Sequence, residues 1–283
     1  MPAKVLEGRQ ISEEIGRSII SEIKTLKEQG VEPRLAMVRI GDGEASRSYF
    51  RSKLRRAREL GVSATPSELP STTTMKEATA IVREMASDPN IHGIIVENEV
   101  PSHIIYEDLV NLIPYWKDLD GASFESLGRL MSGKPCLTAA TPLSVMEFIR
   151  RSEIAPGSMV AVINRTITVG KPLAMLLLAE NYTPVIMHSR SASIREISRK
   201  AAAVVVATGH AGFLTTDFVT EDSAVIDVGI NSVNGKLVGD ADFPSLSSLV
   251  RIITPVPGGV GVVTSTMVFR NLIRGIQMGG MQK

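Results

Sequence analysis

The 283-residue sequence is poor in cysteine, in aromatic side chains and in excess charge of either sign. Cys136 is the only cysteine, so the chain cannot close an internal disulfide or supply a cysteine-based metal cluster, and a reducing compartment is expected. Aromatic residues make up 4% and Trp116 is the only tryptophan, which argues against a platform for stacked bases. With 31 Lys and Arg against 30 Asp and Glu, the formal net charge of +1 lacks the basic excess of a nucleic-acid coat.

Long hydrophobic runs are also missing. The most apolar window, residues 172–179, is too short to cross a bilayer, which needs about 20 residues. The first nine residues lack the unbroken apolar stretch of a signal peptide. We therefore expect a soluble, cytoplasmic protein without nucleic-acid or membrane partners. Its 43% of apolar residues is enough to fill the cores of roughly two domains.

Glycine, proline and the hydrophobic period divide the chain into alternating helices and strands. In the first half we expect helices at residues 11–29, 46–60, 75–85 and 106–113, and strands at residues 34–40 and 93–96. In the second half we expect strands at residues 159–163, 184–188, 203–208 and 224–228, and helices at 143–151, 173–180, 194–200 and 265–276. Residues 123–142 show little periodicity and predict a linker. This alternation predicts an α/β fold with a doubly wound second half.

The turn at residues 164–172 joins a buried strand to a helix, where backbone N–H groups and the helix dipole favour a phosphate. A lone Gly170 stands where a dinucleotide fingerprint has several glycines, so close packing explains it as well as phosphate binding does. The next strand ends in His188-Ser189-Arg190-Ser191, with no carboxylate for a ribose 2′-hydroxyl. Together with Arg165, this composition favours NADP over NAD; the alternative is that both arginines are solvated loop charges.

Tyr49 and Lys53 are four positions apart, so a helix at residues 46–60 presents both on one face. By itself this pair is more typical of an amphipathic surface helix than of catalysis. Asp120 lies in a loop flanked by proline and tryptophan and could accept paired hydrogen bonds from an aminopyrimidine edge. Asp118 is expected to be a turn or cap residue.

Other polar residues favour structural roles over a metal site. Asp240 and Asp242 lie beside a glycine without a histidine or a third acid nearby, which is typical of a turn. His92, His103 and His210 are isolated and are expected to be caps, loop residues or core partners. We expect no metal ion.

Eight short segments, taken together and in order, resemble the bifunctional methylenetetrahydrofolate dehydrogenase/methenyltetrahydrofolate cyclohydrolase family. They are GDGEASRSYFRSK at residues 41–53, KDLDG at 117–121, TP at 141–142, VGKP at 169–172, HSR at 188–190, VIDVGIN at 225–231, VGD at 238–240 and ITPVPGGVG at 253–261. The resemblance therefore spans nearly the whole chain, and its last segment is the most specific.

The resemblance implies an N-terminal α/β catalytic domain over residues 1–142, completed by residues 265–283, and a Rossmann domain over residues 143–264, with a folate cleft between them. It implies NADP-dependent oxidation of 5,10-methylenetetrahydrofolate and hydrolysis of the methenyl product to 10-formyltetrahydrofolate, in one-carbon metabolism and purine biosynthesis. It also implies a homodimer built mainly through the Rossmann domains.

Site residues follow from the same resemblance. Tyr49 and Lys53 would line the catalytic cleft, and Asp120 would hold the pterin ring. The substrate would also be bound by Val96, Glu97, Asn98, Pro257, Gly258, Gly259, Val260 and Gly261. The cofactor would be bound by Asn164, Arg165, Thr166, Val169, Gly170, Lys171, Pro172, His188, Ser189, Arg190, Thr208, Gly209 and Ile230.

The sequence departs from the family pattern at residues 97–101, where Glu-Asn-Glu-Val-Pro replaces the usual Gln followed by Leu-Pro-Leu-Pro. Hydrolysis benefits from a lysine that moves a proton, whereas hydride transfer mainly needs two positioned partners. Glu97 would hold Lys53 as an ammonium by charge pairing, so we expect weakened cyclohydrolase activity. Other departures are expected to loosen the fit of cofactor or folate, namely Asn164 for a glycine, Ala122 for a phenylalanine, and Val262-Val263 for Pro-Met.

Two alternatives stay open at this point. One is another two-domain NADP-dependent dehydrogenase, of the shikimate dehydrogenase type, against which the segment at residues 257–261 argues. The other is a folate or nucleotide sensor that has lost turnover, and the changes at residues 97–99 are its support.

Overall fold

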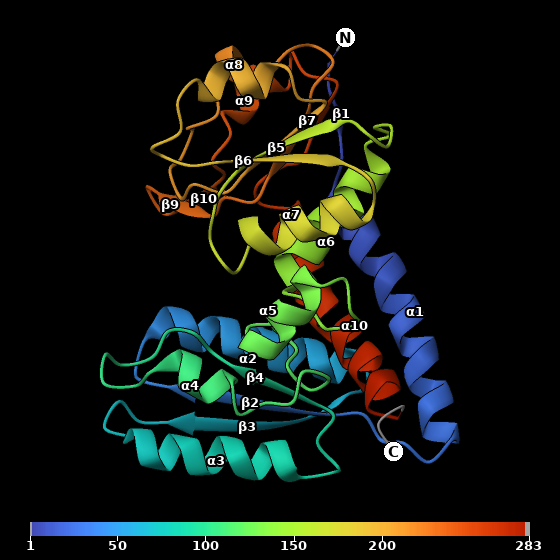
Figure 1. Cartoon of the computed structure of the whole chain (residues 1–283), viewed down its shortest axis with the longest axis vertical. Coiled ribbons are helices and arrows are strands. Elements are labelled where there is room, and N and C mark those ends of the chain that lie inside the picture. Colours follow the sequence, from blue (N-terminus) through green and yellow to red (C-terminus); the bar gives the residue numbers. More distant parts are fainter. Residues whose placement is uncertain (1, 281–283) are drawn as a thin grey trace. The chain divides into compact units, whose positions relative to one another are not determined.

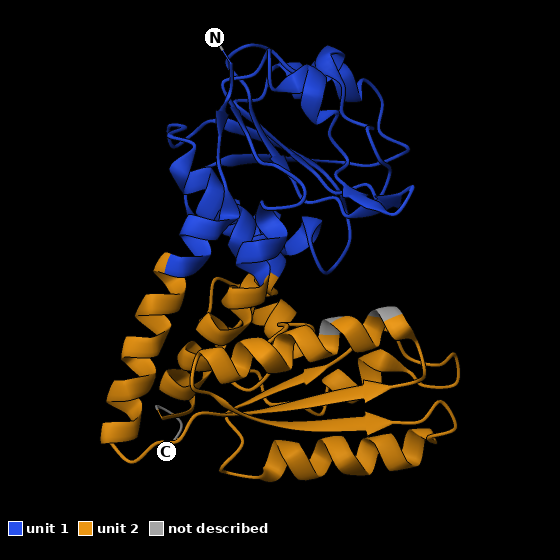
Figure 2. Ribbon diagram, turned by 180° about the vertical axis from the view of Figure 1, so that it is seen from behind, with its two compact units in different colours: residues 1–13, 141–264 blue, residues 14–140, 265–283 orange. Residues whose placement is uncertain are grey.

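The computed structural model describes residues 2–280, and at positions 45 and 49 the backbone alone. The chain divides into two compact units, coloured in Figure 2: unit 1 comprises residues 1–13 and 141–264, and unit 2 comprises residues 14–140 and 265–283. The chain passes between the units within three helices, α1 (Gly8–Glu28), α6 (Ala140–Arg151) and α10 (Val260–Gly280). Within residues 2–280, no helix combines the length and the apolar character that a membrane span needs.

Unit 2 is built on a three-stranded parallel sheet. Its order is β3 (Ser63–Leu69), β2 (Arg34–Ile40), β4 (Gly93–Val96). The helices α2 (Glu44–Glu59) and α3 (Met75–Ser87) lie on opposite sides of these strands (Figure 1). Residues 35–40 of β2 are all buried and, apart from Arg39, all apolar, as expected for a central parallel strand covered on both faces.

Two elements of unit 2 differ from the sequence-based expectation. Strand β3 was not expected, because SATPSEL has no apolar alternation and contains Pro66, which lies opposite Met37 of β2. An edge strand tolerates proline, since one of its sides needs no ladder bonds. The linker predicted at residues 123–142 is wrong over α5 (Phe124–Met131), a short helix whose first turn is capped by the Ser123 side chain.

Unit 1 contains a six-stranded parallel sheet, which confirms the predicted doubly wound fold. The order is β1 (Lys4–Val5), β11 (Ile252–Ile253), β8 (Ala224–Asp227), β7 (Ala203–Val206), β5 (Met159–Ile163), β6 (Thr183–Met187). Residues 1–13, which we expected in the first domain, belong to this unit, because β1 pairs with β11 at the sheet edge. Short elements complete the unit: η1 (Thr216–Phe218), β9 (Asn231–Val233) and β10 (Lys236–Val238).

Helices cover both faces of this sheet. α6 and α7 (Gly170–Ala179) lie on one side, and α8 (Ile194–Arg199) and α9 (Phe243–Leu246) on the other (Figure 1). On the α8 and α9 side, Val204 and Val206 of β7 pack with Phe218 and Leu246 in a continuous buried cluster. The sheet is therefore held from both sides, and the chain at its strand ends is left to form loops.

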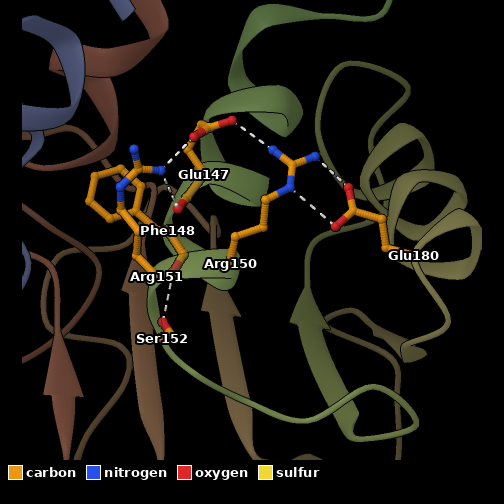
Figure 3. A network of polar contacts seen from close by, with 6 residues as sticks. All are labelled: Glu147, Phe148, Arg150, Arg151, Ser152 and Glu180. Carbon is orange, nitrogen blue, oxygen red and sulfur yellow. Dashed lines mark hydrogen bonds and ion pairs between the residues drawn. The ribbon is translucent and has the colours of Figure 1, made fainter. Parts of the chain in front are cut away.

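An arginine network joins α6 to the end of α7 (Figure 3). Arg150 donates from Nη1 to Glu147 at 2.6 Å, and its Nε and Nη2 both bond the Glu180 carboxylate, which follows α7. Arg151 bonds the other oxygen of Glu147. A guanidinium with two bonds to one carboxylate fixes orientation as well as distance, so the C-terminal ends of the two helices are tied to each other.

In unit 2, α10 approaches the loop at residues 114–121 closely at Gly275. A Cβ at Gly275 would lie 2.3 Å from the backbone oxygen of Trp116. One turn earlier, the buried Asn271 amide donates from Nδ2 to the backbone oxygens of Leu119 (2.8 Å) and Thr138 (2.7 Å). This loop is thus held from one side by the last helix of the chain.

We expect Gly275→Ala to destabilise the protein by about 1–3 kcal/mol, because the added methyl group would push α10 away from that loop. Gly128→Ala is the matched control: Gly128 is also helical, in α5, and nothing lies within 4 Å of a Cβ there. The control is expected to be neutral or to stabilise by up to about 1 kcal/mol, from helix propensity. Urea unfolding measures both changes, and equal midpoints for the two variants would contradict the packing argument.

Candidate functional site

A lysine and a glutamate meet in unit 2. Lys53 of α2 donates from Nζ to Oε1 of Glu97 at 2.7 Å, and their side chains are 24% and 11% exposed. Glu97 directly follows β4, and its backbone N–H donates to the oxygen of Val38 at 2.9 Å, which continues the alignment of β4 with β2. The ion pair that we expected is therefore present, at the carboxyl edge of the sheet.

The loop after β4 and α4 (Tyr106–Val110) brings Asp120 to the same cluster. Asp118 forms a bridge with Ile94 of β4, and its buried carboxylate accepts from the N–H of Ser123 (2.9 Å) and the hydroxyl of Ser126 (2.7 Å). Asp118 thus holds the turn that leads into α5, which confirms the predicted turn role. Its neighbour Asp120 is partly buried and interacts electrostatically with Lys53.

Burial controls the protonation of this cluster. The pKa of Asp120 is raised to about 6, mainly by burial; the charge of Lys53 lowers it, and the charges of Glu97 and Asp118 contribute to raising it. Burial also raises the pKa of Tyr106. Among the neighbouring charges, that of Asp120 raises this pKa most. The cluster therefore combines an ion pair, a carboxyl group that titrates near neutral pH and a phenol that stays protonated.

Tyr106 was missed by the sequence analysis. Only its position in the sequence could have indicated a role, because Tyr106 begins α4 soon after the segment that carries Glu97. Tyr49 lies on α2 one turn before Lys53, and its side chain falls outside the described residues. Val96 is buried at the end of β4, and Asn98 is exposed beside Glu97.

The other predicted substrate residues, residues 257–261, lie in unit 1, where they lead into α10. The Gly8 N–H at the start of α1 donates to the oxygen of Gly258 at 2.7 Å, and a Cβ on Gly8 would lie 2.1 Å from the oxygen of Gly259. Gly258 itself has φ +108°, a conformation that favours glycine. A Cβ on Gly259 would lie 2.4 Å from the oxygen of Pro255, so backbone geometry explains both Gly258 and Gly259.

The loops of unit 1 that were predicted to bind the cofactor follow neighbouring strands. From β5 the chain runs through α7 to β6 on one side, and then crosses through α8 to β7 on the other side of β5. The loops after β5 and β7 therefore adjoin where the winding reverses, which is where doubly wound sheets bind nucleotides.

Asn164 organises the loop after β5. Its Oδ1 accepts from the N–H of Thr166 (2.9 Å), the hydroxyl of Thr166 (2.8 Å) and the N–H of Gly170 (2.9 Å). Its Nδ2 donates to the oxygen of Ala207 after β7 at 2.6 Å. A Cβ on Gly170 would lie 2.1 Å from the backbone oxygen of Asn164, so this position needs glycine. The Asn164 side chain therefore ties the loop after β5 to the loop after β7.

Asp240 holds the loop after β7. We expected a turn residue, but its fully buried carboxylate accepts from the N–H of Thr208, the N–H of Gly209 (2.8 Å) and the Asn231 amide (2.8 Å). Asp227, at the end of β8, likewise accepts three backbone N–H groups, those of Gly229, Asp240 and Ala241. Burial raises its pKa to about 6. Ile230, between these two anchored loops, is 51% exposed.

The remaining predicted cofactor residues surround these loops. The N–H of Lys171 donates to the oxygen of Thr166 at 3.0 Å, Val169 precedes α7, and Pro172 is buried in its first turn. After β6, a turn is closed by the N–H of Ser191 on the oxygen of His188 at 2.8 Å, which leaves Ser189 exposed. Arg165 and Arg190 are also exposed. Arg165 follows β5, and Arg190 follows β6, which is the neighbour of β5 in the sheet.

The isolated histidines take the structural roles that we expected. His92 accepts the N–H of Arg34 on Nδ1, His103 contacts the oxygen of Thr73 at 2.9 Å, and His210 contacts the oxygen of Thr208 at 2.9 Å. Over residues 2–280, no group of three or more His, Cys, Asp or Glu residues could hold a metal ion.

Comparison with known proteins gives matches over both units. A family model described as tetrahydrofolate dehydrogenase/cyclohydrolase, catalytic domain, matches residues 6–120, and the NAD(P)-binding domain of the same family matches residues 139–279. The chain is 39% identical over 274 residues to the bifunctional protein FolD of Thermoplasma acidophilum, which covers 96% of each chain.

Solved structures agree. A bifunctional methylenetetrahydrofolate dehydrogenase/cyclohydrolase from Campylobacter jejuni has a TM-score of 0.95 at 32% identity, over 98% of this chain and 99% of that one. A methylenetetrahydrofolate dehydrogenase-cyclohydrolase from Trypanosoma brucei, complexed with NADP and an inhibitor, has a TM-score of 0.92 at 29% identity, over 99% of both chains.

The raised pKa of Asp120 predicts a pH-dependent stability. Because the folded state disfavours the ionised form, this carboxyl group stabilises the fold at low pH, and that contribution is lost as the pH rises through about 6. Asp120→Asn should therefore raise the free energy of unfolding by about 1–3 kcal/mol near pH 8, with a gain that shrinks as the pH falls toward 4. Urea unfolding across this range measures it.

Asp108→Asn serves as the control for this prediction, because Asp108 is exposed on α4. Its effect on the free energy of unfolding should not change across the same pH range. A gain for Asp120→Asn that is independent of pH would contradict the assignment of a buried, titrating carboxyl group.

Proposed function

Because the chain belongs to the tetrahydrofolate dehydrogenase/cyclohydrolase family, we propose that it oxidises 5,10-methylenetetrahydrofolate with NADP and hydrolyses the methenyl product to 10-formyltetrahydrofolate. The observation that carries this proposal is the cluster of Lys53, Glu97 and Asp120 at the carboxyl edge of the unit 2 sheet. It supplies an ion-paired lysine that can move a proton and a carboxyl group that can bind a pterin, both within the segment that matches the catalytic domain.

Each group of the cluster has a role in this chemistry. The Asp120 carboxylate can accept two parallel N–H bonds from the aminopyrimidine edge of a pterin. The protonated Tyr106 phenol beside it can donate a further hydrogen bond. Lys53 is the group that moves a proton when water adds to the methenyl carbon and the ring nitrogen leaves. Tyr49 lies four residues before Lys53 in α2 and would line the same site.

The loops of unit 1 fit a dinucleotide. Residues 164–170 form a tight loop at the start of α7, a helix N-terminus that favours a pyrophosphate. Arg165 and Arg190 are exposed cations that would pair with a 2′-phosphate. The loops anchored by Asp240 and Asp227 would position Thr208, Gly209 and Ile230 toward the nicotinamide half. When bound, NADP supplies the hydride acceptor, and these residues orient it.

Further features of the proposal follow from the sequence. We propose that the enzyme works in the cytoplasm, as a homodimer without nucleic-acid or membrane partners. Residues 257–261 would contribute to folate binding. Family membership leaves the shikimate-type alternative without support. A sensor that binds folate and NADP without turnover is the other outcome of the assay below.

The assay follows NADPH formation from methylenetetrahydrofolate and, in parallel, decay of added methenyltetrahydrofolate. We expect both activities in the wild type. In Lys53→Met, hydrolysis should fall about 100-fold or more, because a proton-transfer group is lost, and oxidation should fall less. Lys24→Met, on the exposed face of α1 in the same unit, is the control and should leave both rates unchanged.

Two results would count against the proposal. Unchanged activities in Lys53→Met would remove this lysine from the mechanism. Binding of folate and NADP by the wild type without any NADPH formation would favour the sensor.

Cofactor preference is tested on the two exposed arginines. Arg165→Ser and Arg190→Ser should each raise the KM for NADP about 10- to 100-fold and leave the KM for NAD nearly unchanged, since each removes a charge-assisted bond to the 2′-phosphate. Arg195→Ser is the control, because Arg195 is exposed on α8 and already paired with Asp217. Equal losses with NADP and NAD would show that the arginines do not contact the 2′-phosphate.

A further inference from the structure

The Lys53–Glu97 pair gives the lysine an anionic partner. With Nζ and Oε1 2.7 Å apart and the two side chains largely shielded from solvent, the contact is a charge-assisted hydrogen bond. A neutral carboxamide at position 97 would leave the lysine without this ionic partner. The carboxylate therefore works against a lysine that must give up its proton.

Asp120 adds a second negative charge to this pair. When Asp120 is ionised, Lys53, Glu97 and Asp120 together hold one positive and two negative charges. The carboxylate of Asp118 lies near as well, but it is engaged by Ser123 and Ser126. A partly buried cluster of net negative charge stabilises a cation more than a neutral molecule of the same shape.

The two steps of the proposed function differ in the charge of the one-carbon unit. In oxidation, the neutral methylene carbon gives up a hydride to the nicotinamide ring, so the folate becomes the methenyl cation and no proton is released. In hydrolysis, water adds to that cation, the bond from carbon to N5 breaks, N5 gains one proton, and one further proton leaves. The first step creates the positive charge, and the second removes it and needs a proton acceptor.

On the basis of this proposed function, we propose that Glu97 is the specificity-determining residue that favours oxidation over hydrolysis. Its carboxylate stabilises the positive charge that develops on the one-carbon unit during hydride loss. The same carboxylate keeps Lys53 protonated and so slows the proton transfers of hydrolysis. The chain should consequently release a larger share of its product as methenyltetrahydrofolate than an enzyme with an amide at this position.

The test is Glu97→Gln, a substitution that keeps the shape of the side chain and removes its charge. We expect the ratio of the hydrolysis rate to the oxidation rate to rise about tenfold or more, because the freed lysine can accept a proton and the developing cation loses a carboxylate. Glu99→Gln is the matched control: Glu99 is exposed, two residues along the same loop, and should leave the ratio unchanged.

A second experiment measures ligand binding in the absence of turnover and so tests the effect of the Glu97 charge alone. Two affinities are measured, one for the methenyltetrahydrofolate cation and one for neutral 5-formyltetrahydrofolate. The ratio of the first to the second should be about tenfold higher in the wild type than in Glu97→Gln. Fluorescence of Trp116 or calorimetry gives both affinities. A purely structural role of Glu97 would weaken both ligands equally, and urea unfolding of the variant checks that it folds.

The outcomes separate the two proposals. An unchanged ratio, or a hydrolysis rate that falls while oxidation persists, would overturn the role of Glu97 and leave the proposed function standing; the second result would make Glu97 itself the proton acceptor. A wild type with neither activity would overturn the proposed function, and equal affinity ratios in wild type and variant would then overturn the charge argument as well.

Discussion

In both units the strands of the main sheet all run parallel, and this constraint determines where function can lie. The carboxyl ends of parallel strands meet at one edge, so the loops that follow them are gathered there whatever their distance in sequence. In unit 2 this edge brings Glu97, which follows β4, next to Lys53 of α2. In unit 1 it brings the loop of Asn164, which follows β5, next to Ala207, which follows β7.

The carboxylates at these edges are shielded from solvent to different degrees, and they differ in the hydrogen-bond donors that surround them. Asp227 and Asp240 accept backbone N–H groups and so hold loops in place. Gly239 belongs to the same arrangement, since a Cβ there would lie 1.9 Å from Asp227. Burial raises the pKa of Asp120 to about 6, as it does that of Asp227, so both carboxyl groups can exchange a proton near that pH. A buried acid without a full set of donors is costly for folding and useful for binding.

Local pattern was sufficient for the elements that have strong periodicity. The buried strands β2, β4 and β5 lie where the apolar runs predicted them, and α2 and α3 begin within two residues of their predicted starts. β3 and α5 were missed, because the edge strand has no apolar run and the short helix is held by its cap and by tertiary contacts. Segment lengths and apolar content cannot reveal elements that depend on their neighbours for stability.

The sequence by itself determined the fold class, the family motifs and the identity of the charged residues, because these depend on residue order and composition. The resemblance to the family also predicted that Glu97 would pair with Lys53, because the family has a glutamine that bonds the lysine at this position. Only the tertiary structure decided the distance of that pair, the burial that shifts Asp120, and the presence of Tyr106 beside it. Protonation depends on solvent exclusion and on neighbours from other elements, and neither is written in the local sequence.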